Sequence, residues 1–582
     1  MNKAAVREKF AINYSKWENG NDANWYSDDP ILTRYARRYL SEKVREYVEA
    51  SFQKTGALAS GPMDKRAVHT DREGQPRLIR YNKKGEEINE IWYNEGYRQT
   101  VKDGYGTGVV AYRYDANAPE KIPFVVNEIL LYMMCQAESG FTCPVGLSQS
   151  AAFVLEKFGS EQQKEAYLSR LASWDPETHA EGATSLTEIQ GGSDVGATKT
   201  TAVKNSDHYL LSGEKWFVSN CDAEVLIALA RVNDKPSTKG LGLFLVPRKL
   251  ENGGKNNITI RRLKDKLGVR AVASGEVIFN DTVGYLIGEE NKGFKYMAEA
   301  LNVSRLGTGL AGIAVAKRAF LEAAIYTTHR EAFGKSINKF PMVRETLVNM
   351  ITAIEAAWAT LAQVMTCFDN VHTYNNENKE DYDLLRILLS LNKYRGSELG
   401  VQAAKEALEL HGGNGYIEEY VTPRLLRDAI VNPVWEGTAN IQALEILKTM
   451  QKASGERFIQ DLRNTLNRVH HEKLTSLKTF FQEKVIKLED LINHTLSQDE
   501  YTQTALAKKL SDMMYDVFSG VHLLDEAQYD LETNDDGRRV LVVKHWIQMT
   551  LDTSVEKDIL SNFAISDTVF DSLVCFEKAE IE

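Results

Sequence analysis

The stretch that decides the fold is HYLLSGEKWFVSN at residues 208–220. It is rich in Leu, Val and aromatic residues, and Asn220 ends it, which is typical of a β-strand. Similar short runs follow at close spacing, each bounded by Gly, Asn or Asp and without a helical segment between them. These runs are EVLIALARV at 224–232, GLGLFLVPR at 240–248, NITIRRL at 257–263 and SGEVIFND at 274–281. Strands that follow one another in this way predict antiparallel pairing in a small barrel or sandwich over about 185–285.

Helical periodicity lies on both sides of this β region. Upstream, from about 124 to 172, apolar residues recur at the spacing of a helix face. Downstream, long helical segments contain few breakers, and Gly or Pro stands where each should end. These downstream segments are 293–330, 341–371, 383–411, 418–428 and 437–453. The polar stretch 61–90 contains Gly and Pro, and we expect a long surface connection there.

The order of these elements predicts a multidomain, mainly α-helical fold with a central β domain. We expect an N-terminal helical domain over 1–183, a middle β domain over 184–290, a C-terminal helical bundle over 291–453 and a helical extension over 454–582. An apolar helix face needs a partner surface, so the extension should pack on the rest of the chain or on a neighbouring subunit. The residues of this face are Leu506, Leu510, Met513, Met514, Val517, Phe518, Val521 and Leu524.

The composition is that of a large globular protein. The chain has 582 residues, of which 43% are hydrophobic and 26% charged, and this excludes a mini-protein, a collagen and a disordered chain. The net charge of −11 gives no overall attraction for nucleic acid or anionic membranes. Residues 451–582 carry 15 Lys and Arg against 24 Asp and Glu, so the extension is a poor surface for DNA.

The cysteines and the N-terminal segment favour a reducing compartment. The five Cys are odd in number and form no CxxC pair, which argues against a disulfide framework or a zinc site. The first 20 residues contain no apolar core of signal-peptide length, and about 18 consecutive apolar residues occur nowhere. We therefore expect a cytoplasmic protein without a membrane span.

Two short motifs in the β region could meet a flat cofactor. In TEIQGGSD at 187–194, paired glycines let the backbone approach a ligand and hydroxyls can bond its polar edge, although a polar turn explains the motif equally well. In GEKWFVSN at 213–220, strand alternation places Phe217 and Ser219 on one face and Trp216 and Val218 on the other. Core packing by the aromatic residues is the alternative for this strand.

Two further motifs follow long helices. REAFGK at 330–335 places cations at a helix C-terminus, where they are favourable in their own right, or where Arg330 could reach a phosphate or carbonyl. HGGNGY at 411–416 holds more glycine than a helix C-cap needs, which indicates close backbone approach to a ligand. We interpret His411 as a packed or capping residue, because no second metal ligand stands at a suitable spacing.

The segment WEGTANIQ at 435–442 opens the last bundle helix. Glu436 lies between Trp435 and Gly437, just after Pro433. A carboxylate in an apolar cleft gains proton affinity, which suits the general base for a weak carbon acid. The alternative is a glutamate that complements the dipole at the start of a helix.

In this order and layout, the five motifs resemble those of the acyl-CoA dehydrogenase flavoproteins, over roughly 120–452. The resemblance implies that family's fold, with a C-terminal four-helix bundle, and CPVGLSQ at 143–149 and PRLLRD at 423–428 are similar to the branch typified by the AidB flavoprotein. It implies FAD bound between the β domain and the C-terminal helices near a subunit interface, in a homodimer or homotetramer.

The resemblance also assigns cofactor contacts to individual residues. Thr187 would bond the pyrimidine edge of the flavin, with Gly192 beside it, and Ser193 would lie near the pyrophosphate of FAD or the pantetheine arm of the substrate. Phe217, Val218 and Ser219 would form the strand against the isoalloxazine, with Ser219 near N5. The remaining assigned contacts are Thr438 and Asn440 to the adenine half or phosphates, and Arg330, Phe333, Gly412 and Gly413 to the FAD of a neighbouring subunit.

The resemblance implies α,β-dehydrogenation of a fatty acyl-CoA. Glu436 matches the base that removes the α-proton, the β-hydride passes to flavin N5, and electrons leave to an electron-transfer flavoprotein. Arg305 in NVSRLGTG matches an active-site arginine, although a snorkelling or salt-bridged role is the alternative. Fatty acid β-oxidation is the expected setting, and no metal is implied.

One position departs from the family pattern, and two other functions remain open. Glu409 stands where many members carry Gln near the neighbouring FAD, which puts that contact in doubt. The first alternative function is a protective or DNA-associated flavoprotein like AidB, and the acidic extension disfavours it. The second is a protein that binds acyl-CoA with weak or no turnover, and Glu436 argues against it. A flavin monooxygenase of the same superfold fits less well, because those usually lack this glutamate.

Overall fold

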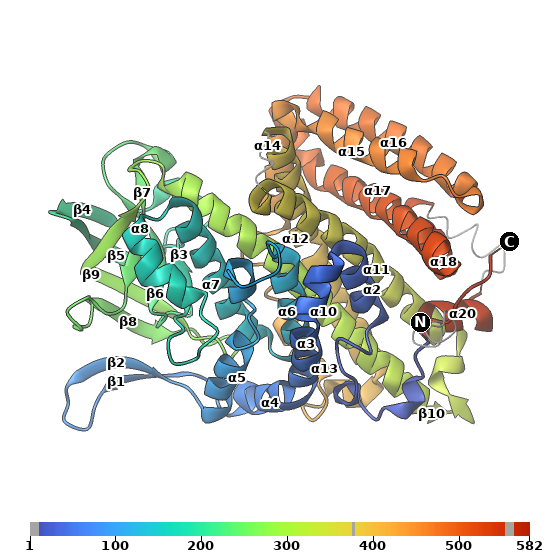
Figure 1. Cartoon of the computed structure of the whole chain (residues 1–582), viewed down its shortest axis with the longest axis horizontal. Coiled ribbons are helices and arrows are strands. Elements are labelled where there is room, and N and C mark those ends of the chain that lie inside the picture. Colours follow the sequence, from blue (N-terminus) through green and yellow to red (C-terminus); the bar gives the residue numbers. More distant parts are fainter. Residues whose placement is uncertain (1–10, 375–378, 553–563, 582) are drawn as a thin grey trace. The chain divides into compact units, whose positions relative to one another are not determined.

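The computed structural model describes residues 11–374, 379–552 and 564–581, which fall into two compact units (Figure 1). Unit 2 consists of Glu46–Gly307, and unit 1 combines Met1–Arg45 with Thr308–Glu582. The two ends of the chain therefore belong to the same unit. The four domains expected from the sequence (1–183, 184–290, 291–453 and 454–582) have boundaries that differ from those of these two units, and that division stays a prediction.

Unit 2 contains the predicted β domain as a closed barrel. The pairings run from β6 to β7, β9, β5, β4 and back to β6, while β3 pairs with β6 and β8 with β9. The strands are β3 (Gly182–Ser185), β4 (Thr201–Asn205), β5 (His208–Ser219), β6 (Val225–Arg231), β7 (Leu241–Pro247), β8 (Ile258–Leu263) and β9 (Ser274–Ile287). Apolar side chains such as Leu211, Leu226 and Phe244 fill its core. The barrel was predicted correctly, but it is mixed, since β6 pairs in parallel with both β3 and β4.

The other elements of unit 2 are mostly helices. They are α3 (Glu42–Leu58), whose first turn belongs to unit 1, α4 (Asp64–Arg72), α5 (Glu95–Tyr105), α6 (Phe124–Ala137), α7 (Ser139–Phe158), α8 (Glu161–Gln163) and α9 (Ser169–Leu171). All of α6 is buried. Helix α10 (Gly293–His329) begins in unit 2 and ends in unit 1.

The segment 61–90 is not the long surface connection that we expected. It contains α4 and most of an antiparallel hairpin, β1 (Arg77–Tyr81) with β2 (Glu87–Trp92), which Figure 1 shows as a long ribbon. Asn82 closes the hairpin turn by accepting from the amides of Lys84 and Glu86. Charged and other polar residues make up most of 77–92, so its composition resembles that of a loop.

Unit 1 is built from long helices. They are α2 (Pro30–Tyr39), the end of α10, α11 (Pro341–Phe368), α12 (Lys379–Leu410), α13 (Thr422–Ala429) and α14 (Ala439–Thr449), and a short hairpin joins β10 (Glu331–Ala332) to β11 (Lys335–Ser336). Helix α12 packs on α11 and α14. It also crosses α10 in backbone contact, because a Cβ atom on Gly312 would lie 2.1 Å from the carbonyl oxygen of Gly396. Glycine is therefore required at this crossing.

Among the described residues, one helical stretch, Pro341–Thr373, is long and apolar enough to cross a membrane. The fold itself buries 78% of its most apolar window. The hydropathy of α11 is thus that of a buried core helix.

The C-terminal extension is helical and packs within unit 1. It contains α15 (Gly455–Arg468), α16 (Thr475–Leu496), α17 (Glu500–Asn534), α18 (Arg538–Trp546) and α20 (Asp567–Val574). Figure 1 shows α15, α16 and α17 side by side, and α17 also packs on α11 and α14. Of the predicted apolar face, Leu510, Met514, Val517, Phe518, Val521 and Leu524 are buried. The prediction that the extension packs on the rest of the chain is confirmed.

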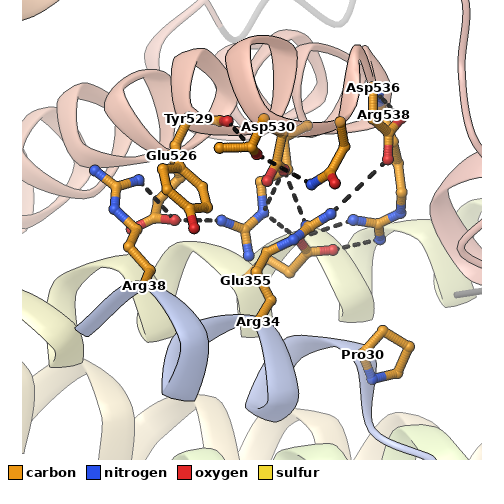
Figure 2. Close-up of polar contacts among 12 residues, drawn as sticks. Pro30, Arg34, Arg38, Glu355, Glu526, Tyr529, Asp530, Asp536 and Arg538 are labelled. Carbon is orange, nitrogen blue, oxygen red and sulfur yellow. Dashed lines mark hydrogen bonds and ion pairs between the residues drawn. The ribbon is translucent and has the colours of Figure 1, made fainter. Parts of the chain in front are cut away.

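A buried cluster of charges joins the N-terminal helix to this extension (Figure 2). Glu355 on α11 accepts from Arg538 Nη1 at 3.0 Å and lies 3.3 Å from Arg539 Nε, and all three side chains are at most 1% exposed. Arg34 on α2 lies 3.0 Å from Asp530, and Arg539 lies 2.5 Å from Glu526. Burial alone would raise the pKa of Glu355, but Arg538 and Arg539 outweigh it and hold that pKa below its usual value.

We expect Glu355→Gln to destabilise the protein strongly. The substitution leaves two buried guanidinium groups without their shared carboxylate, a loss of about 3–5 kcal/mol. Thermal unfolding at pH 7 measures it. Arg463→Gln is the control, because it breaks an α15–α16 ion pair whose side chains are 45% and 35% exposed, and this costs about 0–1 kcal/mol. Equal melting temperatures for the two variants would contradict a structural role of the cluster.

Candidate active site

Glu436 lies on a tight loop of unit 1, between α13 and the N-terminus of α14. Its φ is 56°, which is rare for a residue with a side chain, and Gly437 follows with φ 97°. A Cβ atom on Gly437 would also come within 2.8 Å of Gln442 Nε2 and would disturb its hydrogen bonds to the loop. The loop therefore presents Glu436, which is half-buried, in a conformation that the surrounding contacts must maintain.

Two fully buried side chains hold this loop from beneath. Lys393 Nζ on α12 donates to the carbonyl oxygens of Pro433 at 3.2 Å and Gly437 at 2.5 Å. Gln442 Nε2 on α14 donates to the carbonyl oxygens of Glu436 at 2.9 Å and Gly437 at 3.1 Å. Three loop carbonyls are thus satisfied inside the protein, which fixes the backbone on both sides of Glu436.

The start of α14 is open to a ligand. Thr438 is the N-cap residue, but its hydroxyl makes no capping hydrogen bond, and both Thr438 and Asn440 are exposed. A helix N-terminus with unused donors is suited to an anion such as a phosphate. The two predicted cofactor contacts therefore lie directly beside the predicted base.

The Arg330 and glycine motifs come together at a second place in unit 1. Tyr326 near the end of α10 stacks on the ring of His411, with the ring centroids 4.2 Å apart. Asn414 Nδ2 donates to the Tyr326 hydroxyl at 3.1 Å. His411 is packed, as we interpreted it, and burial lowers its pKa. Gly412 has φ 58°, and a Cβ atom on Gly412 or Gly413 would meet no atom within 4 Å.

The side chains at this second place point to solvent. Phe333 is 97% exposed, and the exposed Arg330 side chain makes no hydrogen bond or ion pair to the described residues. Glu409, which departs from the family pattern, lies 3.0 Å from Lys405. Its charge is thus partly neutralised by its own helix.

Unit 2 carries the TEIQGGSD loop, and a buried ion pair anchors it. Glu188 accepts from Lys215 Nζ at 2.8 Å, from the Thr200 hydroxyl at 2.6 Å and from the Lys199 amide at 2.7 Å. Burial alone would raise the pKa of Glu188, but Lys215 and the hydrogen bonds lower it to about 2. Burial also lowers the pKa of Lys215, although Glu188 opposes this.

The anchored loop leaves its other residues available. Its main chain joins β5, because the Trp216 amide donates to the carbonyl oxygen of Thr187 at 2.8 Å. Thr187 and Gly192 are half-buried and Ser193 is exposed. The hydroxyls and the glycine backbone can therefore meet a ligand while Glu188 holds the loop.

Strand β5 differs from strict alternation. A β-bulge between Lys215 and Val218 turns both of these side chains inward. Phe217 is 56% exposed, and Trp216 is half-buried outside the barrel core. Lys264 Nζ lies 3.4 Å from the centroid of the Trp216 ring and 4.7 Å from that of the Phe217 ring. Our placement of Trp216 beside Val218 is wrong for this reason, whereas Phe217 is exposed as expected. Ser219 is half-buried and shares a hydrogen bond with Ser274.

Each unit thus collects one set of the predicted residues. Unit 2 holds Thr187, Gly192, Ser193 and the strand at 217–219, and Arg305 lies half-buried on its part of α10. Unit 1 holds Glu436 on its loop, Thr438 and Asn440 at the start of α14, and the Arg330 and glycine motifs at a second place. In each unit taken by itself, hydroxyls, glycine backbone and an exposed phenylalanine ring suit the phosphates and flat ring of a large ligand. The residues present therefore fit FAD.

Comparison with known proteins agrees with these features. Three family models match the chain: the acyl-CoA dehydrogenase C-terminal domain over 291–451, its middle domain over 183–282, and the adaptive response protein AidB N-terminal domain over 16–176. The short-chain-specific acyl-CoA dehydrogenase of Clostridium acetobutylicum is 30% identical, over 55% of this chain and 82% of its own length. The chain belongs to the acyl-CoA dehydrogenase family. The family consists of FAD-dependent oxidoreductases that act on CH–CH groups.

Longer relatives match nearly the whole chain. Acyl-CoA dehydrogenase family member 11 of Caenorhabditis elegans is 27% identical over 96% of this chain and 93% of its own length. The putative acyl-CoA dehydrogenase AidB of Escherichia coli is 27% identical over 88% of this chain and 95% of its own length. The solved structure of C. elegans ACDH-11 in complex with C11-CoA has a TM-score of 0.84, at 25% identity and 91% coverage of both chains. The extension is thus shared with relatives of this length.

In this acyl-CoA dehydrogenase we expect Glu188→Gln to weaken FAD binding, because the neutral amide no longer balances buried Lys215 and the loop of Thr187 loosens. An increase of about tenfold in the FAD dissociation constant corresponds to about 1.4 kcal/mol. Titration of the apoprotein with FAD measures it. Glu214→Gln is the control, since Glu214 lies next to Lys215 on β5 and is exposed. Unchanged FAD affinity in Glu188→Gln would rule out a role for the pair.

The same variant has a defined pH dependence. The folded pKa of Glu188, about 2, lies below the unfolded value of about 4.3, so its stabilising effect is complete above the unfolded value and is lost as the pH falls toward 2. The difference in melting temperature between wild type and Glu188→Gln should therefore narrow between about pH 5 and pH 3. A constant difference across this range would contradict the charge-based explanation.

Proposed function

We propose that this chain introduces an α,β double bond into a fatty acyl-CoA, with Glu436 as the α-proton base. The observation that carries the proposal is the left-handed conformation of Glu436, held by Lys393 and Gln442. Such a conformation costs about 1–3 kcal/mol and persists where function selects it. A glutamate that only complemented a helix dipole would not need this loop.

The chemistry follows from the loop. A thioester α-proton is weakly acidic, so a carboxylate must be placed against it and kept from relaxing away. Glu436, half-buried between Trp435 and Gly437, offers such a carboxylate. Bound FAD supplies the acceptor for the β-hydride.

The substrate and the electron acceptor rest on relatives and on the sequence motifs. The C. elegans structure with C11-CoA supports a fatty acyl-CoA as substrate. We propose an electron-transfer flavoprotein as acceptor and β-oxidation as the setting, by resemblance to the family. A cytoplasmic location is part of the same proposal, and the five cysteines are free thiols.

The cofactor contacts are proposed in the same positions as in the sequence analysis. Thr187, Gly192, Ser193 and the strand at 217–219 serve the flavin side, Ser193 and Arg305 also serve the substrate, and Thr438 and Asn440 serve the phosphates or adenine. Arg330, Phe333, Gly412 and Gly413 reach the FAD of a second copy. Exposed apolar side chains of unit 1 support a homo-oligomer: Phe333, Met342, Tyr416, Ile417 and Tyr420.

A protective, DNA-associated function is the second candidate, because the N-terminal segment matches the AidB model. The charge of the extension disfavours it, since 24 acidic residues face 15 basic ones in 451–582. Duplex DNA at physiological salt should therefore leave the protein unshifted in a native gel. A submicromolar, salt-sensitive shift would favour the second candidate.

We expect Arg330→Ala to lose FAD more readily than wild type while acyl-CoA affinity changes little. Arg330 is exposed and makes no ion pair to the described residues, so its removal should not disturb the fold. A charged hydrogen bond of this kind is worth about 1.5–3 kcal/mol. Flavin content after gel filtration measures the effect, and Lys339→Ala, another exposed cation, is the control. Full flavin occupancy in Arg330→Ala would remove it from the site.

The decisive experiment is an anaerobic titration of wild type and Glu436→Gln with acyl-CoA, followed by flavin absorbance. The amide keeps the shape but accepts no proton, so bleaching should slow by about 10²–10⁴-fold or more. FAD and acyl-CoA binding should remain. Glu419→Gln, an exposed glutamate of the same unit, is the control.

Each alternative predicts a different result in this titration. If the protein only sequesters acyl-CoA, wild type shows no bleaching and Glu436→Gln changes nothing. If Glu436 only complements the helix dipole, the variant loses about 0.3–1 kcal/mol of stability and keeps its turnover. Near-wild-type reduction in Glu436→Gln would reject its assignment as the base.

A further inference from the structure

A buried ammonium group lies beneath the loop of Glu436. Lys393 is 0% exposed and sits within α12, between buried Asn392 and Tyr394. Burying a lysine is costly unless its charge is compensated by hydrogen bonds or opposite charge. Its donation to the carbonyl oxygens of Pro433 and Gly437 provides such compensation, and charge-assisted hydrogen bonds are stronger than neutral ones.

The two carbonyls bracket the base in sequence. Pro433 stands three residues before Glu436 and Gly437 one residue after it, so one ammonium group ties down both ends of the turn. Gln442, also 0% exposed, adds the carbonyl of Glu436 itself at 2.9 Å. A left-handed residue relaxes unless its surroundings over-determine it, and these four hydrogen bonds do so.

The position of Lys393 is itself fixed. Helix α12 crosses α10 with backbones in contact at Gly312 and Gly396, three residues beyond Lys393. The Ser397 hydroxyl donates to the carbonyl oxygen of Lys393 at 2.5 Å. The ammonium group therefore extends from a helix whose position along α10 is fixed by this contact. Its hydrogen bonds hold the loop in place relative to that helix.

We propose that Lys393 and Gln442 are positioning residues for the α-proton base: they act through the carbonyls of Pro433, Glu436 and Gly437 and hold Glu436 in its left-handed conformation. The inference rests on the proposed function of Glu436. Neither residue is assigned a contact to substrate or FAD.

The test compares Lys393→Met and wild type as FAD-loaded full-length protein. Methionine keeps the apolar stem and removes both donations. Two readouts are measured: the rate of flavin reduction per bound flavin with C11-CoA, resolved into kcat and KM, and hydrogen exchange of the backbone amides of 433–441. We expect kcat to fall about 10–100-fold with little change in KM, since small misplacements of reacting groups cost about this much. Exchange should accelerate in this loop and not in the β barrel.

Two further variants keep the test decisive. Lys448→Met makes the same substitution at an exposed position of α14 and should match wild type in both readouts. Gln442→Leu removes the other two donations while Lys393 stays, and it carries the test if Lys393→Met does not fold. Wild-type kcat and wild-type loop exchange in Lys393→Met, or in Gln442→Leu where that variant carries the test, would overturn the proposal.

The outcomes also separate this proposal from the proposed function. Glu436→Gln should slow flavin reduction by about 10²–10⁴-fold or more, while its loop exchange stays as slow as in wild type. If wild-type flavin is not reduced by acyl-CoA, the proposed function fails, and the catalytic role of the hydrogen bonds from Lys393 and Gln442 fails with it. If flavin is reduced equally fast in wild type and Lys393→Met, and the amides of 433–441 exchange equally slowly in both, only the positioning role fails.

Discussion

The interaction on which unit 1 depends is the shared carboxylate of Glu355. It lies on the core helix α11 and is fully buried, and it balances Arg538 and Arg539 of the C-terminal extension. Through Glu526 and Asp530 the same cluster reaches Arg34 and Arg38 on α2 (Figure 2). The individual contacts need not be net stabilising compared with an apolar core, but leaving any one charge unpaired is expensive. The cluster therefore selects one arrangement of three distant parts of the chain.

The architecture could be predicted from the sequence where the signal is periodic. Helix-length segments with glycine and proline at their ends, and short apolar runs between turn residues, lie where we expected helices and strands. The signal fails where polar composition hides regular structure, as in the β1–β2 hairpin (77–92). It also fails at the bulge in β5, because nothing between Lys215 and Val218 marks the extra residue that turns both side chains inward.

The candidate site divides in the same way. Glu436, Thr187 and the glycine motifs are recognisable because chemistry restricts their residue types and order. Their supports are not, since Lys393, Gln442 and Glu188 act through backbone or charge contacts that only the folded chain defines. One signal for Lys393 was present: it shares a helical face with Leu389, Gly396 and Gly400, where an exposed lysine would not be expected. A lysine beside apolar and small residues on one helix face indicates a buried partner.

The joining of both chain ends in unit 1 has a consequence for biosynthesis. Arg38 on α2 pairs with Asp525, 487 residues later, and Tyr14 donates to the carbonyl oxygen of Val574, 560 residues later. At about 5–20 residues per second, the ribosome takes about 25–100 s to deliver the first of these partners. Until then α2 lacks these partners: Arg34 and Arg38 keep part of its surface hydrated, while Ile31, Leu32 and Tyr35, which the folded chain buries, remain uncovered. The ion pairs between α2 and the C-terminal extension thus form late in synthesis, once residues 525–536 have been made.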